Sequence, residues 1–304
     1  MRDSFIRKLT EFALVDDKIF LLVGDLGYGV VEDFASQFPN RFLNTGISEQ
    51  NMMGVAAGLA KSGYKVYVYS IANFPTMRCL EQIRNDVAFH DLDVTVVAIG
   101  AGFGYGTLGY SHFAVEDLAV LRALPNIKIF SPSDAYELEV TLETIRSVPG
   151  AKYLRLGKNG EVPLGSSSLT SPFEARELRS GSELIVLSTG GISHEVMKAI
   201  DALEDVNRIK VAHFTVPSLQ YETLESIDIQ SFNGILTVEE HCLDAGFGSF
   251  VLEYLEIQQV LKPVKRLGIP RNFNFQVGDQ EYLRKLAGLD SGSISLEIFK
   301  FLRF

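Results

Sequence analysis

The sequence predicts an α/β protein made of two consecutive three-layer α/β/α domains, the first with a mostly parallel sheet. Two observations carry this prediction. Short apolar runs alternate along the chain with segments of helical periodicity, and strands that are apolar throughout are typical of parallel sheets covered on both faces. A stretch rich in Gly, Ser and Pro, residues 157–172, interrupts this alternation near the middle of the 304 residues and indicates a boundary between domains.

The first half begins with an expected amphipathic helix in which Phe5, Leu9 and Phe12 recur at helical spacing. Strands and helices then alternate, which favours a parallel sheet. The expected strands are residues 18–24, 41–45, 65–71, 94–100 and 127–132. The expected helices are residues 30–38, 49–62, 75–90, 115–124 and 134–147.

The second half repeats the alternation, which predicts a second domain. We expect a first domain at residues 1–160, a linker at 161–180 and a second domain at 181–304. The expected strands are residues 183–189, 209–216, 234–240 and 264–269. The expected helices are residues 192–204, 246–258, 280–288 and, docked at the end of the chain, 293–304.

Composition excludes several classes of partner. The net charge of −10 argues against nucleic acid and anionic membranes, which favour a basic face. Two cysteines, Cys79 and Cys242, provide neither a disulfide framework nor metal-ligand spacing. The chain starts without the apolar core of a signal peptide and contains no apolar run of membrane-spanning length, so we expect a cytoplasmic protein.

Glu49 stands out at the start of the helix expected at 49–62, after Ser48 as a candidate N-cap. A carboxylate in a first turn is commonly a solvent-exposed group favoured by the helix dipole. Here the same helix carries Gly54, Ala57 and Gly58 at helical spacing, which favours close approach of another backbone. Burial at such an interface raises the pKa of a carboxyl group, and this suits proton donation to a ligand nitrogen.

The segment from Gly100 to His112, "GAGFGYGTLGYSH", follows a strand and is rich in glycine. Its glycines do not lead directly into a helix as a dinucleotide fingerprint requires. It is either a flexible loop or a mobile active-site loop, and the second alternative gives His112 an acid, base or hydrogen-bonding role.

Several other side chains follow strands at the edge where open α/β sheets bind ligands. Asp25 either caps a turn or faces a ligand, and Phe74 is either a core residue or a flat platform for a ring. Arg78 lies on the next helix. Arg155 pairs either with an anion or with an interface carboxylate. Spacing alone leaves the structural role open for each of them.

Taken together, the longest of these stretches resemble the C-terminal half of transketolases, in order and over nearly the whole chain. The most specific pieces are "GISEQN" from Gly46 followed by "GLA", and "SHFAVEDLAVLRALPN" from Ser111. "GDLG", "LEQIRNDVAFHDLDV" and "LTVEEHCLDAGFGS" add to the likeness. The resemblance implies a pyrimidine-binding domain of a thiamine-diphosphate enzyme up to about residue 160, followed by the C-terminal domain of that family.

The resemblance also implies roles for individual residues. Glu49 corresponds to the glutamate that hydrogen-bonds the aminopyrimidine ring of the cofactor. His112 corresponds to a substrate-facing histidine, and Phe74 lies where the family stacks an aromatic side chain on the pyrimidine. Asp25, Ile47 and Arg78 are expected around the cofactor. Arg155 falls near the arginine of the family that contacts a substrate phosphate.

Two departures from the family matter. The N-terminal half, with its segment for diphosphate and a divalent metal, is absent. We therefore expect a separate partner chain, an α₂β₂ assembly, and Mg²⁺ or Ca²⁺ bound mainly by that partner, with no metal ligand here.

The family's "D-G-x-T-H" reads "L-G-Y-S-H" in this chain, so Leu108 stands in place of a substrate-reading aspartate. The absence of that carboxylate predicts an unusual ketose substrate.

Other functions stay open at this point. A deoxyxylulose-phosphate-synthase-like enzyme would release carbon dioxide from pyruvate, and the β-subunit of 2-oxo-acid dehydrogenases shares the two-chain arrangement. A non-catalytic transketolase-like module would not bind cofactor even with a partner. A nicotinamide dehydrogenase rests only on the glycine-rich loop. His241 and Cys242 belong to a family signature to which we assign only packing and helix capping.

Overall fold

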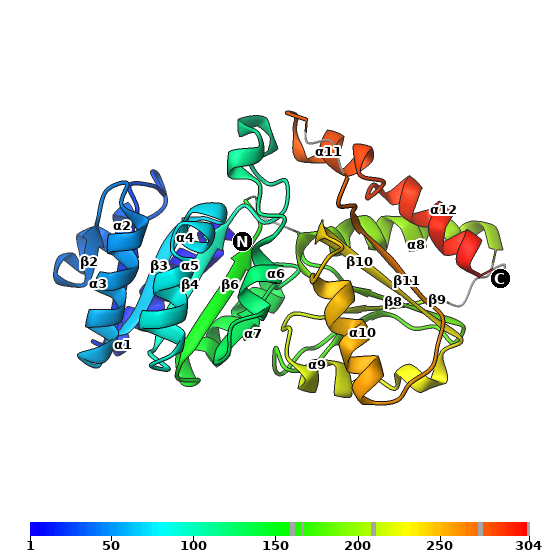
Figure 1. Cartoon of the computed structure of the whole chain (residues 1–304), viewed down its shortest axis with the longest axis horizontal. Coiled ribbons are helices and arrows are strands. Elements are labelled where there is room, and N and C mark those ends of the chain that lie inside the picture. The colour runs from blue at the N-terminus through cyan, green and yellow to red at the C-terminus, as the bar shows by residue number, and fades with distance from the viewer. Residues whose placement is uncertain (159–161, 166, 208–210, 273–275, 303–304) are drawn as a thin grey trace.

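Two α/β/α units lie side by side in the computed structural model, which describes residues 1–158, 162–165, 167–207, 211–272 and 276–302 (Figure 1). Each unit has one central sheet with helices on both faces. The fold class expected from the sequence is thereby confirmed.

The sheet of the first unit has the strand order β2-β1-β3-β4-β6-β5 and is parallel throughout. Its strands are β1 (Ile19–Val23), β2 (Phe42–Asn44), β3 (Lys65–Ile71), β4 (Val94–Ile99), β5 (Ile127–Phe130) and β6 (Ala151–Leu156). Because the strands are parallel, their carboxyl ends meet at one edge, where ligands commonly bind.

The helices of the first unit divide between the two faces of this sheet. They are α1 (Arg2–Val15), α2 (Glu32–Gln37), α3 (Glu49–Lys61), α4 (Asn73–Met77), α5 (Leu80–Gln82), α6 (Asp117–Arg122) and α7 (Ala135–Ser147). Apolar residues of α1, α2 and α7 share one buried cluster. Those of α3 and α6 share another, which continues into the second unit, so the two units have a common core.

The second sheet has the order β11-β10-β8-β9-β7, in which only the edge strand β7 runs antiparallel. Its strands are β7 (Arg176–Arg179), β8 (Leu184–Ser188), β9 (Val211–Thr215), β10 (Gly234–Cys242) and β11 (Val264–Ile269). The helices are α8 (Ser193–Asn207), α9 (Tyr221–Glu225), α10 (Phe247–Ile257), α11 (Gln280–Leu286) and α12 (Ser291–Phe301). The expected strand 209–216 and helix 293–304 extend partly outside the described residues.

Three expectations are corrected. Residues 151–156 form β6, a strand that is missing from the expected elements. Residues 176–179 form β7, although they fall in the predicted linker. The single helix expected at 75–90 is divided into α4, α5 and a π-helical segment at Ile83–Ala88.

The charged residues of β6 explain why the sequence pattern does not predict it. Lys152 and Arg155 are fully buried in this strand, where their charges are compensated by Asp93 and Asp117, respectively. Unpaired charges are rarely buried, so "AKYLRL" does not read as a strand surrounded by core. Its partners come from distant parts of the sequence, which a local pattern cannot reveal.

Within the part of the chain that the structure describes, no helix is both long and apolar enough to cross a membrane.

Buried His213 on β9 predicts a loss of stability in mild acid. The Ser188 hydroxyl lies 2.7 Å from His213 Nε2, and burial lowers the pKa of this imidazole from 6.5 to about 3. Between these two pH values the unfolded chain binds a proton that the folded chain does not, so stability falls as the pH falls. Urea unfolding should show a loss of about 2 kcal/mol from this residue at pH 5 relative to pH 7.5.

His213→Gln should reduce that loss, whereas His90→Gln, which alters an exposed imidazole, should leave it unchanged. Identical pH dependence in wild type and His213→Gln would contradict the prediction.

Candidate functional site

Glu49 begins α3 and is buried, with 3% of its surface exposed. The glycine at the end of β1, Gly24, lies beside it, and a Cβ there would contact the Glu49 side chain at 3.7 Å. Ser48 occupies the N-cap position, but its hydroxyl donates to the Thr45 carbonyl at 2.7 Å instead of capping the helix. Glu49 is therefore buried in the folded chain, as its position beside small residues indicated.

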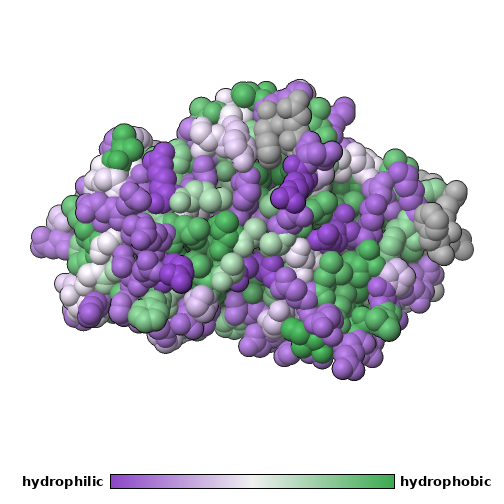
Figure 2. Space-filling view, in the orientation of Figure 1, coloured by the Kyte–Doolittle hydropathy of each residue, from purple (hydrophilic) through white to green (hydrophobic). Residues whose placement is uncertain are grey.

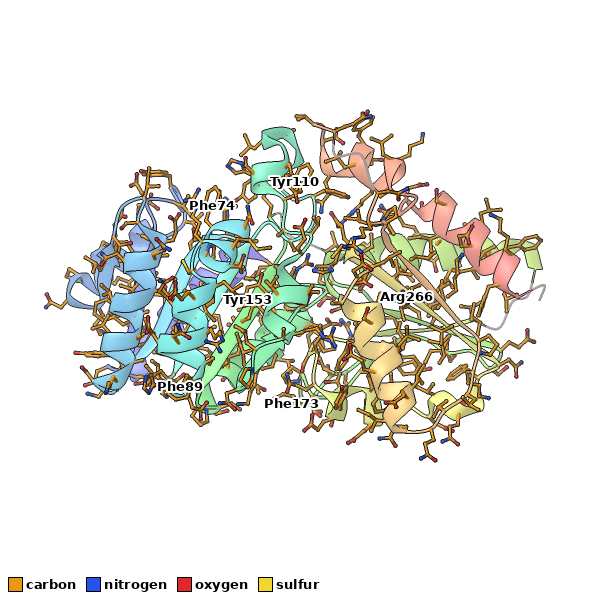
Figure 3. All side chains as sticks on the ribbon, viewed as in Figure 1. Phe74, Phe89, Tyr110, Tyr153, Phe173 and Arg266 are labelled. Atoms are coloured by element: carbon orange, nitrogen blue, oxygen red, sulfur yellow. The ribbon has the colours of Figure 1, made fainter. Side chains whose placement is uncertain are left out.

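Arg78 covers the Glu49 carboxylate. Its Nη1 donates to Glu49 Oε2 at 2.9 Å, and its guanidinium carbon lies 4.1 Å from the centre of the Phe74 ring. Phe74 is part of α4, at the carboxyl edge of the first sheet (Figure 3). The arginine thus links a buried acid to the face of an aromatic ring.

His112 completes this cluster. Its ring meets Phe74 edge-on with 5.1 Å between the centres, and Ser111 Oγ lies 3.0 Å from its Nδ1. The Asn73 amide donates to the Ser111 carbonyl at 2.7 Å and so ties α4 to the loop that carries His112. Partial burial, followed by the charge of Arg78, lowers the pKa of His112, which favours a neutral imidazole at neutral pH.

Ile47 and Asp25 line two different cavities. Ile47 is exposed and lines a cavity of about 420 Å³ together with Glu49 and Arg78. Asp25 lines a separate cavity of about 260 Å³. Its carboxylate accepts hydrogen bonds from Asn44 and Tyr28, which lower its pKa. Ile47 therefore adjoins Glu49, whereas Asp25 belongs to the other cavity.

Arg155 does not reach this cluster. It is buried, and its Nε donates to Asp117 Oδ2 at 2.7 Å, while Nη2 donates to the carbonyls of Ala114 and Glu240. In the free chain the guanidinium of Arg155 is thus engaged by protein groups, and a contact with a substrate phosphate stays a prediction. Of the two alternatives, pairing with a carboxylate is the one seen in the free chain, although Asp117 belongs to the same unit as Arg155.

Leu108 and His241 complete the residues singled out from the sequence. Leu108 is about half exposed, in a 3₁₀ turn (Gly106–Leu108) of the loop that carries His112. His241 is buried, and its Nε2 accepts from the backbone N–H of Leu118 at 3.1 Å and of Ala119 at 3.4 Å. His241 therefore caps a helix of the other unit, which gives a definite partner to the capping role expected from the "VEEH" signature.

A cluster of this kind can bind a flat nitrogen-containing ring and move protons on it or beside it. It offers a buried carboxyl group, an aromatic face and a neutral imidazole within one surface region. Among the described residues, no group of His, Cys, Asp and Glu side chains is arranged to hold a metal ion.

Family models match both units of the chain. Residues 1–159 match the transketolase pyrimidine-binding domain, and residues 174–294 match the transketolase C-terminal domain. The boundary between the two matches lies close to the Gly-, Ser- and Pro-rich stretch of the sequence.

Three known proteins illustrate the similarity. One of the subunits of the apulose-4-phosphate transketolase of Phocaeicola vulgatus is 31% identical, over 99% of this chain and 97% of its own. A solved structure described as a split-gene transketolase, an inactive β₄ tetramer, is 30% identical with a TM-score of 0.85, over 99% of this chain and 97% of its own. 1-Deoxy-D-xylulose-5-phosphate synthase of Caldanaerobacter subterraneus is 35% identical, but the match spans 96% of this chain and only 47% of that enzyme. The chain belongs to the transketolase family and corresponds to its C-terminal half, the pyrimidine-binding domain followed by the C-terminal domain.

Proposed function

We propose that this chain is the C-terminal subunit of a split, thiamine-diphosphate-dependent transketolase that moves a two-carbon ketol unit from a ketose donor to an aldose acceptor. The cluster of Glu49, Phe74 and His112 carries the proposal, because a buried acid, an aromatic face and an imidazole lie within one surface region. These groups form only part of a cofactor site, so turnover requires a second chain.

The guanidinium of Arg78 occupies the place that this proposal gives to the aminopyrimidine ring, so its contacts show which kind of group fits there. Its guanidinium is flat and rich in nitrogen, lies against Phe74 and donates to Glu49. A flat ring with a nitrogen donor satisfies the same two groups, so the residues fit the cofactor. Arg78 has to leave the face of Phe74 when such a ring stacks there, because both need the same space.

Each residue then has a defined task. Thiamine diphosphate, when bound, supplies the electron sink for ketol transfer. Glu49 holds a proton at a pyrimidine nitrogen, Phe74 stacks on the ring, and Ile47 borders it. His112, kept neutral by its lowered pKa, accepts or returns a proton at a hydroxyl of the sugar. Asp25 lines a second, separate cavity.

The partner in this proposal is a separate chain that binds the diphosphate and the Mg²⁺ or Ca²⁺ ion. Gly54 and Gly58 on α3 have open space above them, which supports close approach of another chain. Figure 2 shows hydrophobic residues gathered on this face of the first unit, and Met77 on α4, next to α3, is exposed. The names of the relatives, one subunit of a transketolase and a split-gene β₄ tetramer described as inactive, support a need for a partner and an α₂β₂ enzyme.

We further propose a cytoplasmic enzyme with a ketose donor other than the common pentose phosphates. The side chain of Leu108 makes no hydrogen bond at the position where the transketolase motif has an aspartate. A ketose donor that lacks the matching hydroxyl therefore suits this site. The relative named for apulose 4-phosphate supports an unusual sugar. Equal or better activity on xylulose 5-phosphate than on all other donors tested would refute this part.

Native mass spectrometry of the tagged chain, isolated from its own cells, tests the function. We expect a second chain of similar size with thiamine diphosphate retained, and ketol transfer by that complex. A lone chain or a homo-oligomer that neither recruits a partner nor retains cofactor would contradict the proposal.

A decarboxylating synthase is the second candidate, favoured by the 35% identity to a deoxyxylulose-phosphate synthase. Carbon dioxide release from pyruvate by the isolated complex, without ketol transfer from sugars, would select it.

A further inference from the structure

The loop that carries His112 is closed at its base by a pair of backbone hydrogen bonds. Gly102 N donates to the Ala114 carbonyl and Ala114 N donates to the Gly102 carbonyl, both at 3.0 Å. Between these two residues the chain forms short 3₁₀ turns, the second of which spans Tyr110–His112. The position of His112 therefore depends on what holds this base.

Glu240, near the end of β10 in the second unit, holds the base of the loop that carries His112. The Phe103 N–H donates to Glu240 Oε1 at 2.7 Å, and Glu240 is only 4% exposed. Gly102 has a left-handed φ of 61°, and a Cβ there would lie 2.5 Å from the Glu240 carboxyl carbon. The glycine is needed because the carboxylate packs directly against the backbone of the loop.

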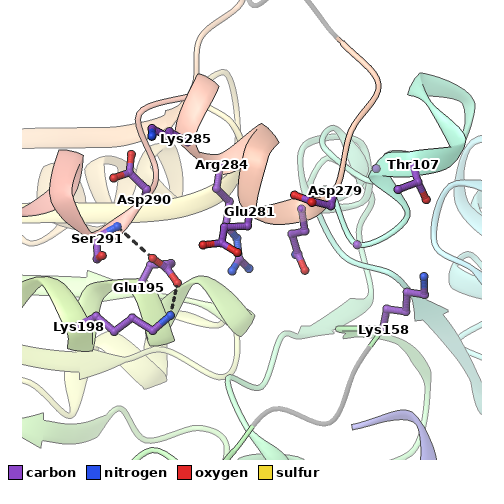
Figure 4. Close-up of a pocket in the computed structure, with 13 residues that line it drawn as sticks. Thr107, Lys158, Glu195, Lys198, Asp279, Glu281, Arg284, Lys285, Asp290 and Ser291 are labelled. Carbon is purple, nitrogen blue, oxygen red and sulfur yellow. Dashed lines mark hydrogen bonds and ion pairs between the residues drawn. The ribbon is translucent and has the colours of Figure 1, made fainter.

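The same carboxylate connects the loop to α11. Gln280 Nε2 donates to Glu240 Oε1 at 2.9 Å, and Arg284 donates to Oε2 through Nε at 2.9 Å and Nη2 at 2.6 Å. Just before α11, Gly278 N reaches the Gly106 carbonyl at 3.4 Å, near the tip of the loop. Residues of the loop, of α8 and of α11 also line a common cavity of about 650 Å³ (Figure 4). The loop is thus held by Glu240 at its base, by Gly278 near its tip and by Asn73 beside His112.

The residues next to Glu240 hold the far end of the same segment. Cys242 N donates to the Val115 carbonyl at 2.8 Å, and His241 caps α6, which begins at Asp117. Three consecutive residues of β10 therefore each bind one part of this segment: Glu240 binds the N–H of Phe103, Cys242 the carbonyl of Val115 and His241 the N–H of Leu118. Only the Glu240 contact lies on the strand of the loop that leads into the 3₁₀ turn with His112.

We propose that Glu240 is a positioning residue for ketol transfer, through which the C-terminal domain fixes the loop that carries His112. The inference rests on the role proposed for His112. Glu240 does not touch the reacting groups; it satisfies the Phe103 N–H and connects the base of the loop to α11. A displacement of a reacting group by about 1 Å is enough to lower a rate by about 10²-fold, so the hold on this loop bears directly on turnover.

The test is Glu240→Ala in the reconstituted complex with partner and cofactor. We expect kcat to fall by about 10²-fold with little change in KM or in cofactor binding, because the lost interaction affects the alignment of His112 and not the affinity of the site. In the free chain, amide hydrogen exchange at Phe103 and Ala114 should accelerate. Glu240→Gln keeps an oxygen for the Phe103 N–H and should recover most of both losses.

Two further variants serve as a control and as a second test of Glu240. Glu297→Ala removes a carboxylate of α12 that binds Lys265 and Lys300, and it should change neither turnover nor exchange in the loop. Gly102→Ala displaces the Glu240 carboxylate without removing it, and it should reproduce the effect of Glu240→Ala if that variant fails to assemble.

The outcomes separate this inference from the proposed function. A wild-type complex without turnover, or a His112→Ala complex with wild-type turnover, removes the role of His112 and this inference with it. An impaired His112→Ala complex beside a fully active Glu240→Ala complex overturns the inference alone. Equal losses in Glu240→Ala and Glu240→Gln, with unchanged exchange at Phe103, also overturn it.

Discussion

Glu49→Gln should lower the turnover of the reconstituted complex by about 10²–10⁴-fold. Glutamine has the size of glutamate and keeps an oxygen that can accept from Arg78, so the fold and the assembly should persist. It has no carboxyl proton to share with a pyrimidine nitrogen, and this loss should appear in the chemical step. Single-turnover kinetics and native mass spectrometry of the same preparation measure the two properties together.

Glu32→Gln is the matched control for Glu49→Gln. Glu32 also begins a helix, α2, but it is exposed and its carboxylate accepts from the Gly29 N–H at 2.7 Å. We expect wild-type turnover from this variant. Wild-type turnover from Glu49→Gln would instead remove the catalytic role of Glu49 and the assignment built on it.

Arg155→Met should destabilise the free chain by about 3–5 kcal/mol, because it leaves the buried Asp117 carboxylate without its cation. Burial opposes the charge of Asp117, but Arg155 and His241 hold the pKa of this carboxyl below its ordinary value. Tyr153 Oη donates to the same carboxylate at 2.6 Å and does not replace the lost charge. Urea unfolding of the free chain at neutral pH measures the effect.

Combining Arg155→Met with Asp117→Asn should recover part of the loss, since the second change removes the unpaired charge. Arg7→Met breaks a half-exposed ion pair with Glu139 and should change stability by less than about 1 kcal/mol. An Arg155→Met chain of wild-type stability whose complex has a raised KM for a phosphorylated sugar would restore Arg155 to the substrate site.

The fold and the identity of the acid were predictable from the sequence because their signals are local. Apolar runs alternating with helical periodicity predict two α/β/α units, and burial on both faces of a parallel sheet produces that pattern. Glu49 is recognisable because it begins a helix whose Gly54 and Gly58 leave an open surface. A motif of this kind lies within one helix, so its residues keep fixed spacing in the sequence.

The strand β6 and the fate of Arg155 were decided by the tertiary structure. Lys152 and Arg155 become acceptable in a core only beside Asp93 and Asp117, which lie 59 and 38 residues away in the sequence. An ion pair between such distant residues leaves no local periodicity. Without those partners the same two side chains would indicate a surface segment, which is why no strand was expected there.

The arrangement around His112 was also decided only by the tertiary structure. The histidine is visible in the sequence as a candidate, but its contact with Phe74 joins a helix that follows β3 to a loop that follows β4. The carboxylate that holds the base of its loop, Glu240, is 137 residues from Phe103. The sequence by itself determined the two units, the family and the buried acid, whereas tertiary packing, within the first unit and between the units, decided which charges are structural and where the histidine lies. The physical reason is that hydrogen bonds and ion pairs between residues far apart in the sequence depend on distances in space, which spacing along the chain does not encode.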